Sequence, residues 1–140
     1  MPIKNILVVD DSPTERHIMT QLLQGAGYEV STAEGGDEGV ERAKQLKPDL
    51  ILMDVNMPVL SGIKAAAAIT AALPVPIIMV TAYSSEETVN AALDAGAAAY
   101  LVKPVTREQL LPAIRIAQAR FAMLMEARKE GESGRRRITQ

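Results

Sequence analysis

The sequence predicts an α/β fold in which a five-stranded parallel sheet carries helices on both of its faces. Short runs of branched or consecutively apolar residues alternate with stretches that have helical spacing and helix start signals. Three of these runs are apolar at consecutive positions, as strands buried on both faces require. Five strands that alternate with five helices favour a parallel sheet enclosed by two helical layers, a three-layer α/β/α arrangement.

Length and composition are consistent with one globular domain. A chain of 140 residues buries about 68% of its unfolded surface. Because there is no cysteine, disulfides and thiolate metal sites are excluded, and a metal site must use oxygen ligands or His17. The net charge of −2 gives no overall signature of nucleic-acid binding. Neither a signal peptide nor a membrane-spanning run is present in the sequence, which favours a cytoplasmic protein.

The first strand is predicted at NILVVD, residues 5–10, and a helix follows it. Ser12 suits the N-cap of this helix, Pro13 its first position and Glu15 the partner in a capping box. Four apolar residues then form one helix face and two glycines mark its end: Ile18, Met19, Leu22, Leu23, Gly25 and Gly27. The second strand is predicted at YEVSTA, residues 28–33.

The third and fourth strands are predicted at LILMDV, residues 50–55, and PIIMVTA, residues 76–82. The segment SSEETVNAALDAG then repeats the helix start signal, with Ser84 and Glu87 as a capping box and Gly96 as the stop. The stretches between successive strands have helical spacing, so each pair of strands is joined by a helical crossover.

The fifth strand lies in AAAYLVKP, residues 97–104, and a long helix follows it. The helical pattern runs from Thr106 to about Lys129, and Pro112 should kink or loosen its first turns. Apolar positions along this helix have the 4-3-4-3 spacing of a coiled-coil seam: Leu110, Ile114, Ala117, Phe121 and Leu124.

This pattern divides the chain into three parts. We expect one domain over residues 1–120, an extension of the final helix over 121–130 and a disordered basic tail over 131–140. We also expect a homodimer through the final helix, because its apolar positions continue beyond the sheet: Ile114, Phe121 and Leu124.

Polar side chains close the predicted strands at one edge of the sheet. Asp10 and Asp11 end the first strand, Asp54 the third, Thr81 the fourth and Lys103 the fifth. Ligands of open parallel sheets bind at this carboxyl edge. Three carboxylates form a hard oxygen site suited to Mg²⁺, which relieves their mutual repulsion together with Lys103.

A carboxylate beside Mg²⁺, a lysine and a threonine suits transfer of a phosphoryl group onto the carboxylate itself. Two other classes fit less well. A nucleotide-binding module is disfavoured because the turn DDSPTE has two carboxylates and no glycine-rich cradle. A phosphatase of the haloacid-dehalogenase type needs a second aspartate two residues after the nucleophile, where this chain has Ser12 or Pro13.

The sequence resembles the response-regulator receiver domains of two-component signalling over about residues 3–120. The matching motifs are the acidic pair Asp10-Asp11, LMDVNMPVLSG around Asp54, VTA with Thr81, and YLVKP with Tyr100, Lys103 and Pro104. The resemblance implies a doubly wound, flavodoxin-like (CheY-like) fold. It also implies a phosphoacceptor domain that receives its phosphoryl group on Asp54 from a sensor histidine kinase or a phosphotransfer protein, and that catalyses its own phosphorylation and dephosphorylation.

The same resemblance implies the ligands of Mg²⁺. These are expected to be Asp11, Asp54 and the backbone carbonyl of Asn56, with Asp10 reached partly through water.

Roles at the neighbouring strand ends follow from the resemblance as well. Thr81 and Lys103 are expected to hold phosphoryl oxygens, and the Lys103–Pro104 peptide bond is expected to be cis. On phosphorylation Thr81 should move toward the phosphoryl group, and Tyr100 should rotate into the space it leaves.

Two outputs remain open. Only about twenty residues follow residue 120, so we expect a stand-alone receiver that acts through protein contacts or as a phosphate relay, without contacting nucleic acid or membrane. The alternative is the receiver part of an RNA-binding transcription antiterminator, since LLPAIRIAQARF resembles the helix that joins receiver and output in that (ANTAR) group of regulators.

Overall fold

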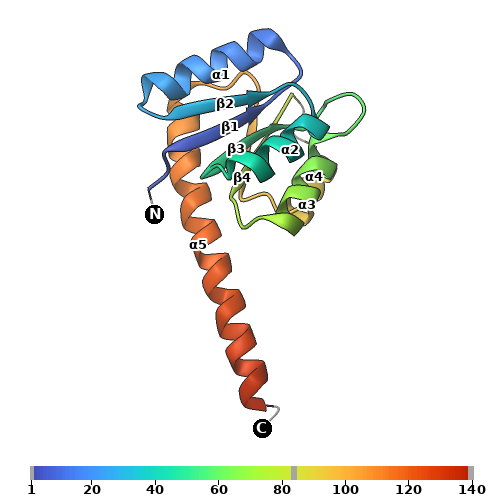
Figure 1. The fold of residues 1–140 in the computed structure, drawn as a ribbon, viewed down its shortest axis with the longest axis vertical. Coiled ribbons are helices and arrows are strands. Elements are labelled where there is room, and N and C mark those ends of the chain that lie inside the picture. Colours follow the sequence, from blue (N-terminus) through green and yellow to red (C-terminus); the bar gives the residue numbers. More distant parts are fainter. Residues whose placement is uncertain (1, 83–84, 139–140) are drawn as a thin grey trace.

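The computed structural model describes the backbone of residues 2–82 and 85–138 and the side chains of residues 2–82 and 85–127, and it has the predicted three layers (Figure 1). Strands and helices alternate along the whole chain. In chain order the elements are β1 Asn5–Val9, α1 Pro13–Gly25, β2 Glu29–Ala33, α2 Gly36–Leu46, β3 Leu50–Asp54, α3 Gly62–Ala72, β4 Ile77–Thr81, α4 Glu86–Asp94, β5 Ala99–Val102 and α5 Arg107–Ile138.

The five strands form one parallel sheet in the order β2-β1-β3-β4-β5. From β1 the chain passes first to β2 on one side and then to β3 on the other, which makes the sheet doubly wound. Ligands of such sheets bind at the point where the strand order reverses, here between β1 and β3. The register pairs Val9 with Met53 and Thr81 with Val102, so the residues after these strands meet at one edge.

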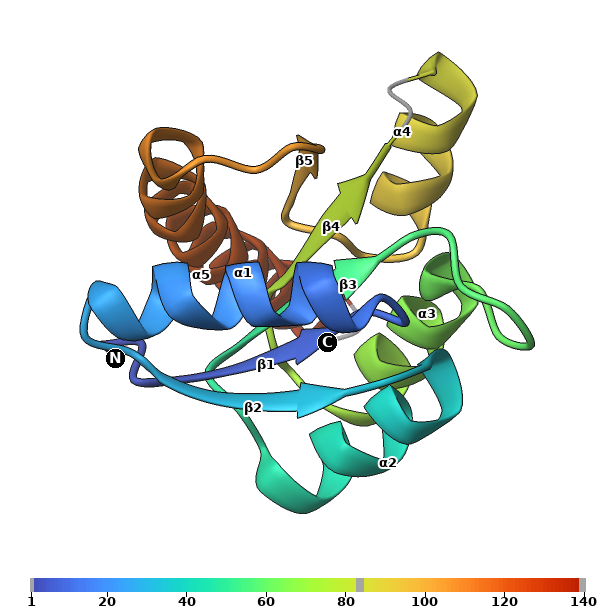
Figure 2. The same cartoon turned by 90° about the horizontal axis from the view of Figure 1, so that it is seen from above.

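Alternate residues of the central strands enter two separate cores. Leu7 and Val9 pack in the core under α2, α3 and α4, whereas Ile6 and Val8 pack in the core under α1 and α5. Figure 2 shows α1 and α5 on one face of the sheet and α2 and α3 on the other. Because successive side chains of a strand point to opposite faces, strands covered on both faces must be apolar at every position.

Helix caps agree with the sequence at α1 and differ by one residue at α4. Ser12 caps α1 by accepting a hydrogen bond from the Glu15 N–H, and Pro13 is the first helical residue. The cap of α4 is Ser85, which accepts from the Thr88 N–H. The expected cap, Ser84, lies outside the described residues. Two adjacent serines offer the same cap chemistry, so the sequence alone did not distinguish them.

The final helix differs from the prediction in two respects. It runs for 32 residues, to Ile138, so the disordered tail expected from residue 131 is helix in the structure. Glu132 and the three arginines of this segment favour helix, which offsets the low propensity of its two glycines. Pro112 lies inside the helix, as the predicted range from Thr106 to about Lys129 required.

The second difference concerns the expected dimer seam. Ile114 is buried with Leu110 and Ala117 against the sheet of its own domain, so its assignment to a dimer contact is wrong. Beyond Ala117, Met123 is 71% exposed and Leu124 is 53% exposed; Ile116, which precedes Ala117, is exposed on another side of the helix. Figure 1 shows that α5 projects far beyond the sheet. None of the described helices combines the length and the apolar character needed to cross a bilayer.

One glycine ties α3 to the end of β3, and its replacement gives a test of this fold. A Cβ at Gly62 would collide with the backbone carbonyl of Asp54. We expect Gly62→Ala to destabilise the domain by about 1–3 kcal/mol or more, since a backbone atom must shift. Gly25→Ala is the matched control: a Cβ there meets nothing within 4 Å, and relief of glycine's backbone entropy should stabilise the protein by roughly 0.5–1 kcal/mol. Urea denaturation measures both; equal stability of the two variants would contradict the packing described.

Candidate functional site

Two buried carboxylates share one ammonium group at the carboxyl edge of the sheet. Asp10 and Asp54 are each only 3% exposed. The Lys103 Nζ lies 3.4 Å from Asp10 Oδ2 and 3.3 Å from Asp54 Oδ1. It also forms an ion pair and a hydrogen bond with the Glu15 carboxylate. The structure therefore brings together residues from the ends of three strands and from the first turn of α1.

Backbone groups fix the orientation of both aspartates. The Ser12 N–H donates to Asp10 Oδ1 at 2.9 Å, and the Asn56 N–H donates to Asp54 Oδ1 at 3.3 Å. Each carboxylate thus receives a hydrogen bond from the residue two positions later, a local pattern that bends the chain away from the strand. The loops after β1 and β3 turn at these two points.

The loop after β1 is also held by Arg16. Its Nη1 donates to the backbone carbonyl of Asp10 at 2.7 Å, and its Nη2 lies 3.6 Å from a carboxylate oxygen of Glu34. Because Glu34 follows β2, this arginine connects the loops at the ends of two neighbouring strands.

Burial changes the acid–base properties of the cluster. It raises the pKa of the Asp10 carboxyl to about 7. The Asp54 and Glu15 carboxylates also raise this pKa, whereas the hydrogen bond from the Ser12 N–H and the charge of Lys103 lower it. Burial also raises the pKa of Asp54, in part offset by Lys103. The pKa of Lys103 is raised to about 12: burial opposes this shift, but Glu15, Asp54 and Asp10 outweigh it. The buried carboxylates are therefore under-compensated by a single ammonium.

The oxygen donors at this edge fit a divalent cation. One carboxylate oxygen from each of Asp10, Glu15 and Asp54 lies within 4.8 Å of the others. Hard carboxylate oxygens at this spacing suit Mg²⁺, whose charge would supply the compensation that one ammonium lacks. Asp11 is exposed and lies outside this group, although its charge contributes to the raised pKa of Asp54. Asn56, whose backbone carbonyl is the other expected ligand, follows Asp54 closely.

Sequence reasoning missed Glu15 as a member of the site. We predicted it as the capping-box partner of Ser12, but the Ser12 N–H is taken by Asp10 and the Glu15 carboxylate turns to Lys103. The sequence does contain one signal: Glu15 lies in the first turn of a helix that begins directly after the two aspartates. The Glu15 carboxylate could pair with the Ser12 N–H or with Lys103. The choice depends on where Lys103 lies, and the sequence alone does not give that position.

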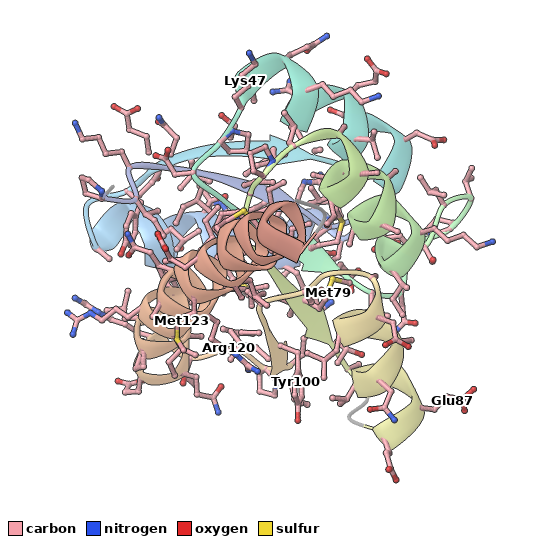
Figure 3. The ribbon with its side chains drawn as sticks, turned by 90° about the horizontal axis from the view of Figure 1, so that it is seen from below. Lys47, Met79, Glu87, Tyr100, Arg120 and Met123 are labelled. Atoms are coloured by element: carbon pink, nitrogen blue, oxygen red, sulfur yellow. The ribbon has the colours of Figure 1, made fainter. Side chains whose placement is uncertain are left out.

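The two expected switch residues lie on adjacent strands with opposite exposure. Thr81, at the end of β4, is buried. Tyr100, in β5, is 41% exposed and points outward (Figure 3). The backbone N–H of Lys103 donates to the Thr81 carbonyl at 2.8 Å, so the strand end that carries Thr81 is tied to the lysine. The Lys103–Pro104 peptide bond is cis.

The loop after Asp54 contains a strained residue. Val59 has φ 70°, and the Leu60 N–H donates to the Pro58 carbonyl at 2.9 Å across it. This is the pattern of a classic γ-turn, which is rare and costly for a branched residue. Val59 is almost completely exposed, so packing against the described residues does not compensate for this backbone conformation. The turn presents an apolar side chain five residues after Asp54.

Known proteins resemble this chain in sequence and in structure. The sequence profile of the response regulator receiver domain matches residues 6–115. The transcriptional regulatory protein PdtaR of Mycobacterium tuberculosis is 44% identical over 119 residues; the match covers 84% of this chain and 58% of PdtaR. Protein PilH of Pseudomonas aeruginosa is 43% identical over 112 residues, covering 78% of this chain and 93% of PilH.

Among solved structures, the chemotaxis protein CheY4 of Vibrio cholerae superposes with a TM-score of 0.76 at 37% identity. The match covers 81% of this chain and 98% of CheY4. These similarities agree with the flavodoxin-like strand order and with the acidic cluster at the strand ends. The chain belongs to the response-regulator receiver domain family, the phosphoacceptor domains of two-component signalling.

Proposed function

We propose that the Asp54 carboxylate of this chain accepts a phosphoryl group from a phosphohistidine of a sensor kinase or phosphotransfer protein. The observation that carries the proposal is the contact of Lys103 with both buried aspartates, because it places a cation where an anionic group would be transferred. We propose a sensor kinase or a phosphotransfer protein as the partner because receiver domains of this family interact with such proteins. We propose a location in the cytoplasm on the same ground.

In the reaction, an oxygen of Asp54 attacks phosphorus while the bond between phosphorus and the histidine nitrogen breaks. The nitrogen keeps the electron pair of that bond. Lys103 binds a phosphoryl oxygen and Thr81 a second one, so charge on the transferring group is compensated. Asp10, Asp11, Asp54 and the Asn56 carbonyl would hold Mg²⁺, which would supply the further positive charge that an anion needs in order to approach this acidic edge.

Two outputs are compatible with this site. The principal one is a protein contact that changes with phosphorylation, as proposed for a stand-alone receiver; the similarity to PilH over nearly the whole of that protein supports it. The second is the receiver part of an antiterminator-type regulator. The similarity to PdtaR, a transcriptional regulatory protein, supports this second output. The matched part of this chain spans 58% of the length of PdtaR.

The surface that would change is formed by α4, β5 and α5. A groove there is lined by apolar and charged side chains, among them Leu93, Tyr100, Val102, Ile116 and Arg120. Figure 3 shows Tyr100 and Arg120 on this side of the molecule. Rotation of Tyr100 toward Thr81 would remove a large side chain from the groove and change its shape for a partner.

A homodimer through α5 is a further part of the proposal. At 1.5 Å per residue, a helix of 32 residues is about 48 Å long, well beyond the roughly 17 Å of a five-residue strand. Beyond Ala117 the helix leaves Leu124 exposed and Phe121 half-buried. An apolar stripe on a projecting helix is favourable when a second copy covers it.

The phosphorylation proposal predicts that Asp54→Asn abolishes labelling by a small acyl phosphate, because the amide oxygen is a poor nucleophile. Omission of Mg²⁺ should abolish labelling of the unchanged protein as well. Asp11→Asn should weaken Mg²⁺ binding without unfolding the domain. The control is Asp37→Asn, since Asp37 is an exposed carboxylate of α2 that lies outside the cluster. Intact-mass spectrometry detects the added phosphoryl group; labelling of Asp54→Asn at the normal rate would refute the assignment.

The switching proposal predicts that Tyr100 becomes buried when a phosphoryl analogue binds. With Mg²⁺ and beryllofluoride, the ring signals of Tyr100 should shift and lose access to a soluble paramagnetic probe, because the ring moves into the space left by Thr81. Tyr28, half-buried just before β2, serves as the internal reference and should not change. Unchanged Tyr100 signals in a protein that has bound the analogue would rule out this route.

The dimer proposal predicts a change of mass in solution. The chain should form a dimer of 15.0 kDa subunits, and Leu124→Glu or Phe121→Glu should convert it to monomer by placing a charge in the stripe. Met123→Glu is the matched control, since Met123 is exposed but points to another side of the helix. Light scattering after size separation gives the masses. A monomeric wild type, or loss of the dimer in Met123→Glu alone, would contradict this interface.

A further inference from the structure

Glu15 makes a contact that the proposed transfer reaction does not use. It lies in the first turn of α1, and its carboxylate forms an ion pair with Lys103 instead of capping the helix. The cap hydrogen bond it would accept in a capping box is already made, because the Ser12 N–H donates to Asp10. The Glu15 carboxylate therefore does not take part in a capping box; it is directed at Lys103 and lies beside the Asp10 carboxyl.

The three carboxylates around Lys103 differ in how readily they can leave. The side chains of Asp10 and Asp54 are 4% and 3% exposed, and both are held by backbone N–H groups. The Glu15 side chain is 37% exposed, and no backbone N–H of the described residues is recorded as a donor to its carboxylate. A group that leaves toward water recovers its hydration, so Glu15 is the partner that an incoming anion displaces at least cost.

We propose that Glu15 is a positioning residue that holds the Lys103 ammonium in the resting site and that the phosphoryl group must displace it. The inference rests on the proposed function, in which Lys103 binds a phosphoryl oxygen. Lys103 has one ammonium, and it already contacts three carboxylates. An anion on Asp54 gains its interaction with Lys103 only as the contact with Glu15 is lost, so the two compete.

Competition by contact can be separated from simple repulsion by charge. Glu15→Gln removes both the charge and the ion pair. Glu15→Asp keeps the charge but shortens the side chain by one methylene, which withdraws the carboxylate from Lys103. If the contact holds the lysine, both variants should bind the phosphoryl analogue more tightly. If only the negative charge matters, Glu15→Gln alone should do so.

The experiment is a beryllofluoride titration at saturating Mg²⁺, followed by amide NMR signals of residues around Asp54. We expect both Glu15 variants to bind about twofold to fivefold more tightly than wild type, the range for release of one partly exposed ion pair. Glu34→Gln is the control: it removes a nearby carboxylate that pairs with Arg16, not with Lys103, and should leave the affinity unchanged. Thermal unfolding establishes that each variant is folded.

A second titration, with Mg²⁺ alone, distinguishes positioning from a general structural effect. Because Glu15 belongs to the carboxylate group that fits the cation, each Glu15 variant is compared with wild type at the Mg²⁺ concentration that saturates that variant. Its analogue affinity should rise there, whereas damage to the fold would weaken analogue binding. Unchanged analogue affinity in both Glu15 variants, or tightening in Glu15→Gln alone, would overturn the inference. Failure of the wild type to bind Mg²⁺ and the analogue would instead refute the proposed function, and this inference with it.

Discussion

The sharing of Lys103 by buried carboxylates is the interaction on which the arrangement of this domain depends. Asp10 and Asp54 end neighbouring strands, and burial at that position makes their charges costly. Lys103 reaches them from the end of β5, two strands away from β3 in the sheet. The acidic edge is thereby tied together across the sheet, yet it stays short of positive charge. That deficit makes the site receptive to a cation and, through it, to an anion.

Much of the fold follows from local patterns in the sequence. Apolar runs such as LILMD predicted the strands buried on both faces, and the Ser12-Pro13 pair predicted the start of α1. The strand ends also predicted that Asp10, Asp54 and Lys103 meet, because parallel strands end at one edge. The same prediction included Asp11, which is exposed and lies outside the carboxylate group. The predictions that succeeded depend on residues close in sequence or on the direction of the strands.

The predictions that failed depend on competition between distant partners. Glu15 had a local capping partner in the sequence and a better one, Lys103, that only the folded chain brings near. Ile114 continued an apolar spacing that extends along the whole of α5, but the sheet of its own domain covers it. A heptad pattern does not distinguish packing against a sheet from packing against a second helix. The partner of each apolar residue depends on where α5 leaves the sheet. Ala117 lies before that point and is buried, whereas Leu124 lies beyond it and is exposed.

The proposed function depends on Lys103 binding an oxygen of the phosphoryl group on Asp54. A crystal structure with Mg²⁺ and beryllofluoride tests it most directly, because it locates the anion and the lysine together. We expect beryllium bonded to an Asp54 oxygen, a fluoride within hydrogen-bond distance of Lys103 Nζ, and the Glu15 carboxylate turned away from that nitrogen. An anion bound elsewhere, or bound to Asp54 with Lys103 directed away from it, would contradict the account.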